Sequence, residues 1–448
     1  MFSLFAWPIR VFRNFRQSIA YLTSLITLFY LSLGLLAVLS PIDESQLPGF
    51  LEPLTFDNPD TARTLLATLI GGMISLVVFS FSMVMSVLSQ AGSNFSLKLV
   101  FSLVTERRHQ QVLGHYLGTI LFILVLLMVP MEGATPDLWR SLAVYLGAGM
   151  VINCLALFVY FIHNASQSVQ INAVTQGLHR SAQASMERLE TKQQAKTWRY
   201  LSSFPVSEKT CHWIYSDQSG YIQNANLEEL AKLAEKIDAA IHLNFAFGDY
   251  TIKAFPLLKV ESDQTPSETW CKSALSQLEY VEGESVKSLY VNGLTQLMEV
   301  AIKALSPGIN DPGTARLCLH QITELLCQRL SFQPCNTLTD DQGRIRVTWP
   351  EERFNSLVYK LFTPILYYGR SDVSICLSLL KALKTLSLFA ENEQLEVIQA
   401  HAERVIEALT ELHNDALDQE FIAARLNKGE HRLRLPNSLP LDTPRRPV

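Results

Sequence analysis

The chain has 448 residues, of which 48% are hydrophobic and 18% charged, and its mean hydropathy is +0.15. This composition is too apolar for an ordinary soluble enzyme and predicts membrane-spanning segments, with length enough for two or three domains. The net charge of −5 and the pI of about 6.1 give no electrostatic reason to expect nucleic acid as a partner.

An aromatic and basic segment, residues 1–17, precedes four long runs without Asp, Glu, Lys or Arg. Its composition predicts an interfacial segment on the cytoplasmic leaflet. The first run, 18–39, is too long for the apolar part of a signal peptide and no small-residue cleavage site follows it, so we expect it to remain as a span. The other runs are 64–88, 112–129 and 142–162, and together they predict a four-helix transmembrane domain over 18–163.

The loop charges predict the orientation of these spans. Arg10, Arg13 and Arg16 precede the first run, and the loop between the second and third runs is also basic. The remaining two loops carry mainly Asp and Glu. Because basic loops stay on the cytoplasmic side, both termini are predicted to be cytoplasmic.

Small polar residues mark the second span. They recur at helical spacings of three, four or seven and therefore share one face. Such a face suits close helix packing, which we favour, or lines a polar path in an oligomer. Pumps and ion-coupled transporters usually keep an ionisable group within the membrane, and the four runs carry no Asp, Glu, Lys or Arg, so the sequence disfavours both classes. The residues of this face are Gly71, Ser75, Ser82, Ser86 and Ser89.

Amide and hydroxyl groups then gather at the cytoplasmic exit of this span, at Gln90, Ser93 and Asn94. We favour a capped helix exit here over a site for a lipid headgroup or another anion.

The cytoplasmic half is predicted to have four parts. Residues 164–203 are predicted to form a helical stalk with a narrow apolar stripe suited to pairing with another helix, in the same chain or in a second subunit. Residues 204–262 alternate like strands around a helix capped by Asn226 and predict a small α/β module, in which Pro256 argues for an edge or interrupted strand. Residues 263–428 predict a larger helical bundle, and 429–448 a disordered tail.

Within the bundle we expect one short interruption. Its predicted helices cover 268–280, 285–305, 311–331, 351–367, 371–390 and 393–426. Residues 339–344 between the third and fourth helices predict a turn, flanked by possible strand residues at 345–347.

The loop 304–315 joins two of the longest predicted helices. Pro307 cannot continue a helix, and Asp311 followed by Pro312 predicts an N-cap and a first helical residue. A helix start offers free backbone N–H groups and hence a possible anion or carbonyl site, but we favour a structural corner. Its candidate residues are Ser306, Pro307, Gly308, Asn310, Asp311 and Pro312.

Recognisable catalytic and cofactor motifs are absent from the sequence. It has no phosphate loop, no dinucleotide fingerprint, no nucleophile elbow and no zinc-protease motif, so we predict no enzyme activity, no cofactor and no metal. Two pairs do not suffice for a metal site: His320 with Glu324, and Cys211 with His212. A third pair, Glu282 with Glu284, is better explained as an acidic helix entry than as an acid/base pair. Seven cysteines without Cys-x-x-Cys spacing predict free thiols.

The run Ser306-Pro307-Gly308-Ile309-Asn310-Asp311-Pro312 resembles the signature of a bacterial predicted-membrane-protein family known as a domain of unknown function (twenty-two fifty-four). The second span ending in Ser89-Gln90 and the strand Ser219-Gly220-Tyr221-Ile222-Gln223 match the same family in order, so the resemblance covers nearly the whole chain. It implies a multi-pass bacterial inner-membrane protein with four spans and a cytoplasmic domain, and it implies no activity.

Two places depart from the family pattern. Glu284-Ser285 and Leu289 stand where a basic-Thr pair and a later Asp are expected, and Ala254 stands where the family tends to Gly.

Two functions are compatible with this sequence. The leading hypothesis is a homo-oligomeric channel-like or solute-permeation protein whose second span lines the path and whose cytoplasmic domain gates or senses. The alternative is a membrane-anchored ligand sensor or scaffold, in which the spans only anchor and the loop at 306–312 binds a small ligand or partner.

Overall fold

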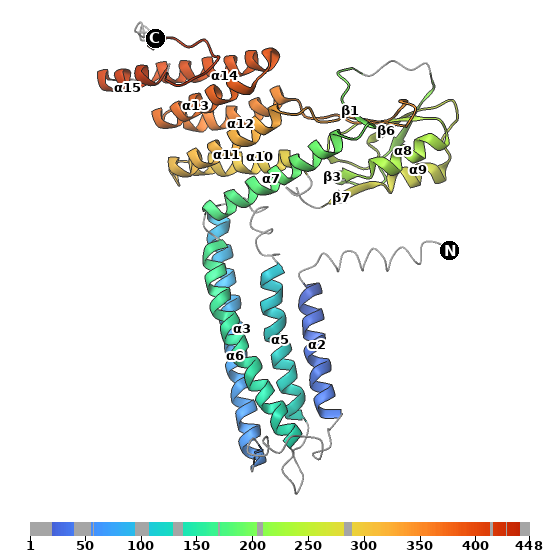
Figure 1. Ribbon diagram of the computed structural model, residues 1–448, viewed down its shortest axis with the longest axis vertical. Helices are drawn as coiled ribbons and strands as arrows, with labels where there is room; N and C mark the ends of the chain where they lie inside the picture. Colours follow the sequence, from blue (N-terminus) through green and yellow to red (C-terminus); the bar gives the residue numbers. More distant parts are fainter. Residues whose placement is uncertain are drawn as a thin grey trace. The chain divides into compact units, whose positions relative to one another are not determined.

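A computed structural model of the chain divides into two compact units, Met1–Ala173 and Val174–Val448 (Figure 1). It describes residues 20–39, 55–56, 58–94, 107–128, 138–168, 171–203, 209–281, 289–412, 415–426 and 428–439. The predicted interfacial segment 1–17 lies outside these residues.

The first unit is built from long apolar helices. In the part of the chain described above, four of them are long and apolar enough to cross a membrane, which agrees with the four predicted spans. They are α2 (Ala20–Leu39), α3 (Pro59–Asn94), α5 (Arg107–Met128) and α6 (Leu138–Ser168).

Helices α2 and α5 pack very closely, because glycines of α5 face side chains of α2. A Cβ added at Gly118 would lie 2.7 Å from Tyr30 Cγ, and one added at Gly114 would lie 3.0 Å from Ile26 Cβ. This is the Gly-x-x-x-Gly pattern that brings membrane helices together. Both glycines lie in the third uncharged run, so their spacing of four is readable from the sequence.

The described residues of the second unit form two sheets. The larger has the strand order β1-β8-β9-β4-β6-β2, in which β4 and β9 are parallel and the other neighbours are antiparallel. The smaller has the order β5-β3-β7. The strands of the larger sheet are β1 (Trp198–Arg199), β2 (Cys211–Tyr215), β4 (Ala240–Leu243), β6 (Pro256–Glu261), β8 (Thr337–Thr339) and β9 (Ile345–Thr348); those of the smaller are β3 (Gly220–Ala225), β5 (Tyr250–Thr251) and β7 (Leu278–Val281).

These sheets extend beyond the predicted module 204–262. Strand β1 comes from the predicted stalk, and β7, β8 and β9 come from the predicted helical bundle. The predicted helix 268–280 is a shorter helix, α9 (Glu268–Leu275), followed by β7. Strands this short are stabilised by their neighbours in the sheet, so their own composition does not predict them.

The predicted strand that contains Pro256 is two strands in different sheets, β5 and β6. A turn separates them, in which Phe255 N donates to Ile252 O at 3.1 Å and Ala254 has a φ of 67°. Strand β6 lies between β4 and β2, so of the two alternatives drawn from Pro256 the edge strand is wrong and the interrupted strand is confirmed. Pro256 is tolerated because it is the first residue of the strand.

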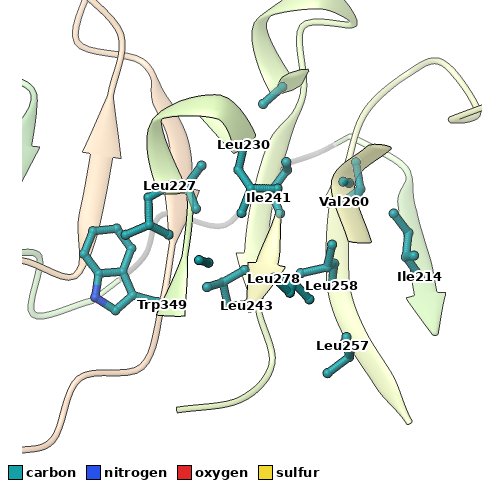
Figure 2. Close-up of a cluster of buried hydrophobic side chains, with 14 of the residues drawn as sticks. Ile214, Leu227, Leu230, Ile241, Leu243, Leu257, Leu258, Val260, Leu278 and Trp349 are labelled. Carbon is teal, nitrogen blue, oxygen red and sulfur yellow. The ribbon is translucent and has the colours of Figure 1, made fainter. Parts of the chain in front are cut away.

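One face of the larger sheet is apolar and forms a core with α8 (Leu227–Lys236) and α9, as Figure 2 shows for Leu230, Ile241 and Leu258. The alternation of strand residues places Ile241 on this face and His242 on the other. Asn226 caps α8 as predicted, since its side chain accepts from Glu229 N at 3.2 Å.

The helical part of this unit follows the predicted order with shifted ends. The predicted helix 393–426 is two helices, α14 and α15. The helices are α10 (Tyr290–Ala304), α11 (Pro312–Leu330), α12 (Phe354–Gly369), α13 (Val373–Phe389), α14 (Asn392–Glu411) and α15 (Ala416–Leu426).

The first part of the predicted disordered tail is ordered against the bundle. Arg432 N donates to Ser387 Oγ at 3.0 Å, Arg434 N donates to Gln399 Oε1 at 2.8 Å, and Leu433 between them is buried. Side-chain acceptors on α13 and α14 fix this segment, which its own composition does not reveal.

The predicted stalk is helical as α7 (Ile171–Gln193). The sequence predicts that its apolar stripe pairs with another helix, in the same chain or in a second subunit. Leu178, Ala182 and Met186 of that stripe are already buried in the single chain, and His179 lies 3.2 Å from Glu324 of α11. The apolar stripe of α7 is therefore covered by other residues of the same chain, without a second subunit.

Candidate functional site

The loop between α10 and α11 is a corner held by its own hydrogen bonds. Asp311 N donates to Ala304 O at 2.8 Å, Asn310 N donates to Ser306 O at 2.9 Å, and Ser306 Oγ donates to Lys303 O at 2.6 Å. Asn310 has a φ of 49°, in the left-handed region that Asn adopts more readily than most residues. These bonds turn the chain from one helix into the next.

Asp311 caps α11, as predicted. Its Oδ2 accepts from Thr314 Oγ1 at 2.6 Å and its Oδ1 accepts from Thr314 N at 3.1 Å. The hydroxyl and backbone N–H of Thr314 together lower the pKa of Asp311, so its carboxylate stays charged. Pro312 has no N–H to offer a ligand. The start of α11 already holds this carboxylate, which disfavours a second anion there.

The outer side of this loop is open to solvent. Pro307, Gly308 and Asn310 are exposed, and a Cβ added at Gly308 would meet nothing within 4 Å. The corner interpretation explains Ser306, Asp311 and Pro312, whereas a binding role for the exposed residues stays a prediction.

The small polar face of α3 points away from the rest of the unit. Its members are all exposed, and a Cβ added at Gly71 would meet nothing within 4 Å. The buried residues Leu66, Met73 and Ser80 recur every seven residues roughly on the opposite side of the helix. Packing between the described helices therefore uses a different face from Gly71, Ser75, Ser82, Ser86 and Ser89.

The exit of α3 is helical through Asn94. The side chains of Gln90, Ser93 and Asn94 lie outside the described part of the structure, so their predicted role in capping stays untested.

A buried polar cluster joins α10, α11 and the segment before α12, and the sequence analysis missed it. Arg329 Nε donates to Tyr290 Oη at 3.1 Å, and Arg329 Nη1 donates to Phe332 O at 3.0 Å. Tyr290 Oη lies 3.5 Å from Glu351 Oε1. Burial raises the pKa of Glu351 to about 7, although Arg329 opposes the shift. No local motif marks these residues, because they lie 22 or more positions apart in the sequence.

A second ionic network closes one end of the larger sheet. Asp340 lies 2.9 Å from Arg346 Nη2 and 2.8 Å from Arg344 Nε, and Asp238 lies 3.1 Å from Arg346 Nη1. Burial alone would raise the pKa of Asp340, but hydrogen bonds from Arg344 and Arg346 outweigh it and hold the pKa at about 2. Asp340 belongs to the predicted turn, which the structure contains between β8 and β9. The network fastens that hairpin to the end of β4.

Two residues that depart from the family pattern, Ala254 and Leu289, lie in the described part of the structure. Each occupies a position where the backbone favours a different residue type. Ala254 has its φ of 67° at the third residue of a four-residue turn, where glycine is favoured. Leu289 occupies the N-cap of α10 and provides no side-chain hydrogen bond, which an Asp would do.

The weaker pairs weighed from the sequence do not combine into a site. Glu324 pairs with His179 rather than with His320, and β2 places Cys211 and His212 on opposite faces. Glu282 and Glu284 lie outside the described residues. Within the described ranges there is no group of three His, Cys, Asp or Glu arranged to hold a metal ion, and all seven cysteines are free thiols.

Comparison with known proteins agrees with the sequence resemblance. The family described as Predicted membrane protein (DUF2254) matches residues 16–385. Uncharacterized proteins from Mycobacterium bovis and Mycobacterium tuberculosis are each 22% identical to this chain over 422 residues, which cover 91% of this chain and 80% of theirs. No solved structure matches the chain.

Proposed function

We propose a function from the premise that this chain belongs to the family described as Predicted membrane protein (DUF2254). The proposal is an oligomeric channel-like or solute-permeation protein of the bacterial inner membrane, with both termini in the cytoplasm and a cytoplasmic domain that senses or gates. It assigns no catalytic step, cofactor, metal or nucleic-acid partner to the chain.

The observation that carries the proposal is the exposed small polar face of α3. Ser82 and Ser86 are exposed on this helix beside Val78 and Phe79, which suit contact with lipid. Lipid gains nothing from a row of hydroxyls, whereas a second copy of the chain can pack closely against small residues and share hydrogen bonds with them. Several copies meeting through this face would surround a narrow, uncharged polar path.

The first test measures whether the copies meet at this face. Ser82→Cys, placed in a Cys211→Ser background that removes an exposed thiol, is expected to form a disulfide-linked dimer in native membranes. Phe81→Cys is the matched control, because Phe81 is also exposed but lies outside the row. Equal cross-linking of the two variants would contradict the proposed interface.

The second test measures permeation. Purified chain in liposomes is expected to conduct ions or pass small solutes, and Ser82→Leu or Ser86→Leu is expected to reduce that flux while Val78→Leu leaves it unchanged. Absence of conductance and flux, together with an intact cellular phenotype of the leucine variants, would refute the channel. Reporter fusions after residue 439 and within 40–54 test the proposed orientation.

One observation favours the alternative of a membrane-anchored sensor or scaffold. Asn310 is exposed in a left-handed conformation, and its side chain makes no hydrogen bond to another described residue. A ligand bound at the loop would raise the melting temperature of the full chain by mass action. Metabolites and nucleotides are the probes, and Asn310→Ala is expected to abolish any shift. No shift with any probe counts against this alternative.

A further inference from the structure

An amide side chain lies exposed near the middle of the span α6. Asn153 is close to the centre of the apolar stretch Leu138–His163, and its side chain makes no hydrogen bond to another described residue. The adjacent side chains of Ile152 and Leu155 are exposed too, and they suit contact with lipid. Lipid tails offer an amide neither a donor nor an acceptor, so the amide of Asn153 requires a polar partner from outside the single chain.

The small polar face of α3 has the complementary chemistry. Ser75 of that face is exposed, and its hydroxyl donates to Gly71 O at 3.0 Å within the same helix. The Ser75 oxygen therefore keeps lone pairs with which it can accept from an amide N–H. A Cβ added at Gly71 would meet nothing within 4 Å, so this place also lets a neighbouring helix approach closely.

Asn153 and Ser75 lie at nearly the same depth in the first unit. The helices α3 and α6 are the second and fourth spans and cross the membrane in the same direction. The rings of Phe79 in α3 and Phe158 in α6 are 5.7 Å apart, which fixes the relative height of the two helices. Ser75 is four residues before Phe79 and Asn153 is five residues before Phe158, so their heights differ by about 1.5 Å.

Copies of a membrane protein are related by rotation about the membrane normal, and such a rotation leaves every height unchanged. Asn153 of one copy therefore reaches the level of Ser75 in the next copy. We propose that Asn153 Nδ2 donates a hydrogen bond to Ser75 Oγ of the neighbouring copy, so that α6 docks on the small polar face of α3. The proposed contact rests on the proposed function, since it names the surface that the α3 face meets in the oligomer.

The contact joins two different faces of the chain, which makes it heterologous. A heterologous contact repeated about one axis closes a ring, whereas a face that pairs with itself across a two-fold axis stops at a dimer. In the ring, Ser82 and Ser86 further along α3 are left to face the central path.

A second Asn153 is the other amide partner available at this height, across a two-fold axis. Such a pair would leave Ser75 and Gly71 exposed to lipid. The contact between α6 and α3 covers the amide and the small polar face together, and for this reason we prefer it.

Cross-linking between two differently tagged chains tests which residues meet. Ser75→Cys in one chain and Asn153→Cys in the other, both with Cys211→Ser, are expected to form a disulfide-linked mixed dimer in native membranes treated with iodine as oxidant. Leu155→Cys replaces Asn153→Cys in the matched control, because Leu155 is exposed on a different side of α6. Equal linking in the control, or linking of Asn153→Cys only to itself, overturns the proposal.

A second measurement tests the hydrogen bond. Self-association of the full chain in liposomes is followed by energy transfer between donor-labelled and acceptor-labelled copies. Asn153→Ala and Ser75→Ala are each expected to weaken association about three- to tenfold, and the double variant is expected to weaken it by less than the product, since both changes remove the same bond. Leu155→Ala is expected to have little effect. Association that Asn153→Ala leaves unchanged, or effects of the two variants that multiply fully, would contradict the bond.

The contact and the proposed function fail in different ways. If Ser82→Cys chains cross-link while the Ser75→Cys and Asn153→Cys pair does not, the contact between α6 and α3 is overturned and the proposed oligomer stands. If the natural chain does not self-associate in liposomes, the proposed oligomer itself is overturned, and this contact with it.

Discussion

Gly118→Ala adds one methyl group at the closest contact between α2 and α5. The new Cβ would lie 2.7 Å from Cγ and 2.9 Å from Cβ of Tyr30, whereas carbon atoms in good contact are about 3.5–4.0 Å apart. Tyr30 or its helix must therefore move by about 1 Å. The ring is held by its 2.8 Å hydrogen bond to His115, so the movement also weakens that bond.

These two effects set the expected magnitude. Overpacking costs about 1–3 kcal/mol, and loss of a buried hydrogen bond costs about 1 kcal/mol more. We therefore expect Gly118→Ala to lower the free energy of unfolding of the first unit by about 2–4 kcal/mol.

The assay is reversible unfolding of the full chain in mixed micelles with an increasing fraction of denaturing detergent. Gly149→Ala is the matched control, because a Cβ there would meet nothing within 4 Å. Adding Tyr30→Ala to Gly118→Ala removes the contacts with the ring and leaves only the one with Cβ, so the two losses are expected to sum to more than the double variant shows. If Gly118→Ala falls within about 0.5 kcal/mol of Gly149→Ala, the close-packing argument is refuted.

Three further predictions concern the second unit. Ala254→Gly is expected to raise the free energy of unfolding by about 1 kcal/mol, because its φ of 67° suits glycine; thermal melting checks this, and a lower melting temperature would contradict it. Asp340→Asn is expected to cost about 1–2 kcal/mol, while the exposed neighbour Asp341→Asn costs little. Because the folded pKa of Asp340 is depressed, its stabilisation is present above about pH 4 and is lost as the pH falls towards 2. Between these pH values the free energy of unfolding should therefore change less with pH in Asp340→Asn than in the natural chain. Burial raises the folded pKa of Glu351 to about 7, so the folded chain keeps a proton that the unfolded chain releases, and stability should fall as the pH rises from about 4.5 to about 7. Melting curves across that range should lose this slope in Glu351→Gln, and an unchanged slope would exclude Glu351 as its source.

Some features of this chain are properties of short, contiguous stretches of sequence, and those were predictable. A run of about twenty uncharged apolar residues satisfies its backbone only as a helix in lipid, which is why four such runs predicted four long apolar helices. The caps at Asn226 and Asp311 were equally readable, because an N-cap bonds a backbone N–H only three residues away.

The candidate loop was predictable to the same extent. The sequence around Pro312 predicts where α11 starts, because proline and its preceding Asp act locally. It does not predict the second hydrogen bond to this carboxylate, from Thr314 Oγ1, since that bond depends on how the Thr314 side chain is oriented in the folded chain.

Other features join residues that are distant in sequence, and only the tertiary structure decided them. Strand β9 pairs with β4 although Val347 and its partner Ile241 lie 106 positions apart in the sequence, because a short strand is stabilised by its neighbours rather than by itself. Tyr290, Arg329 and Glu351 form one cluster because three separate elements pack together. The same reason determines which face of α3 is buried: its periodicity reveals that Ser75 and Ser82 share a face, but only the positions of the neighbouring helices turn Ser80 inward and leave that face exposed.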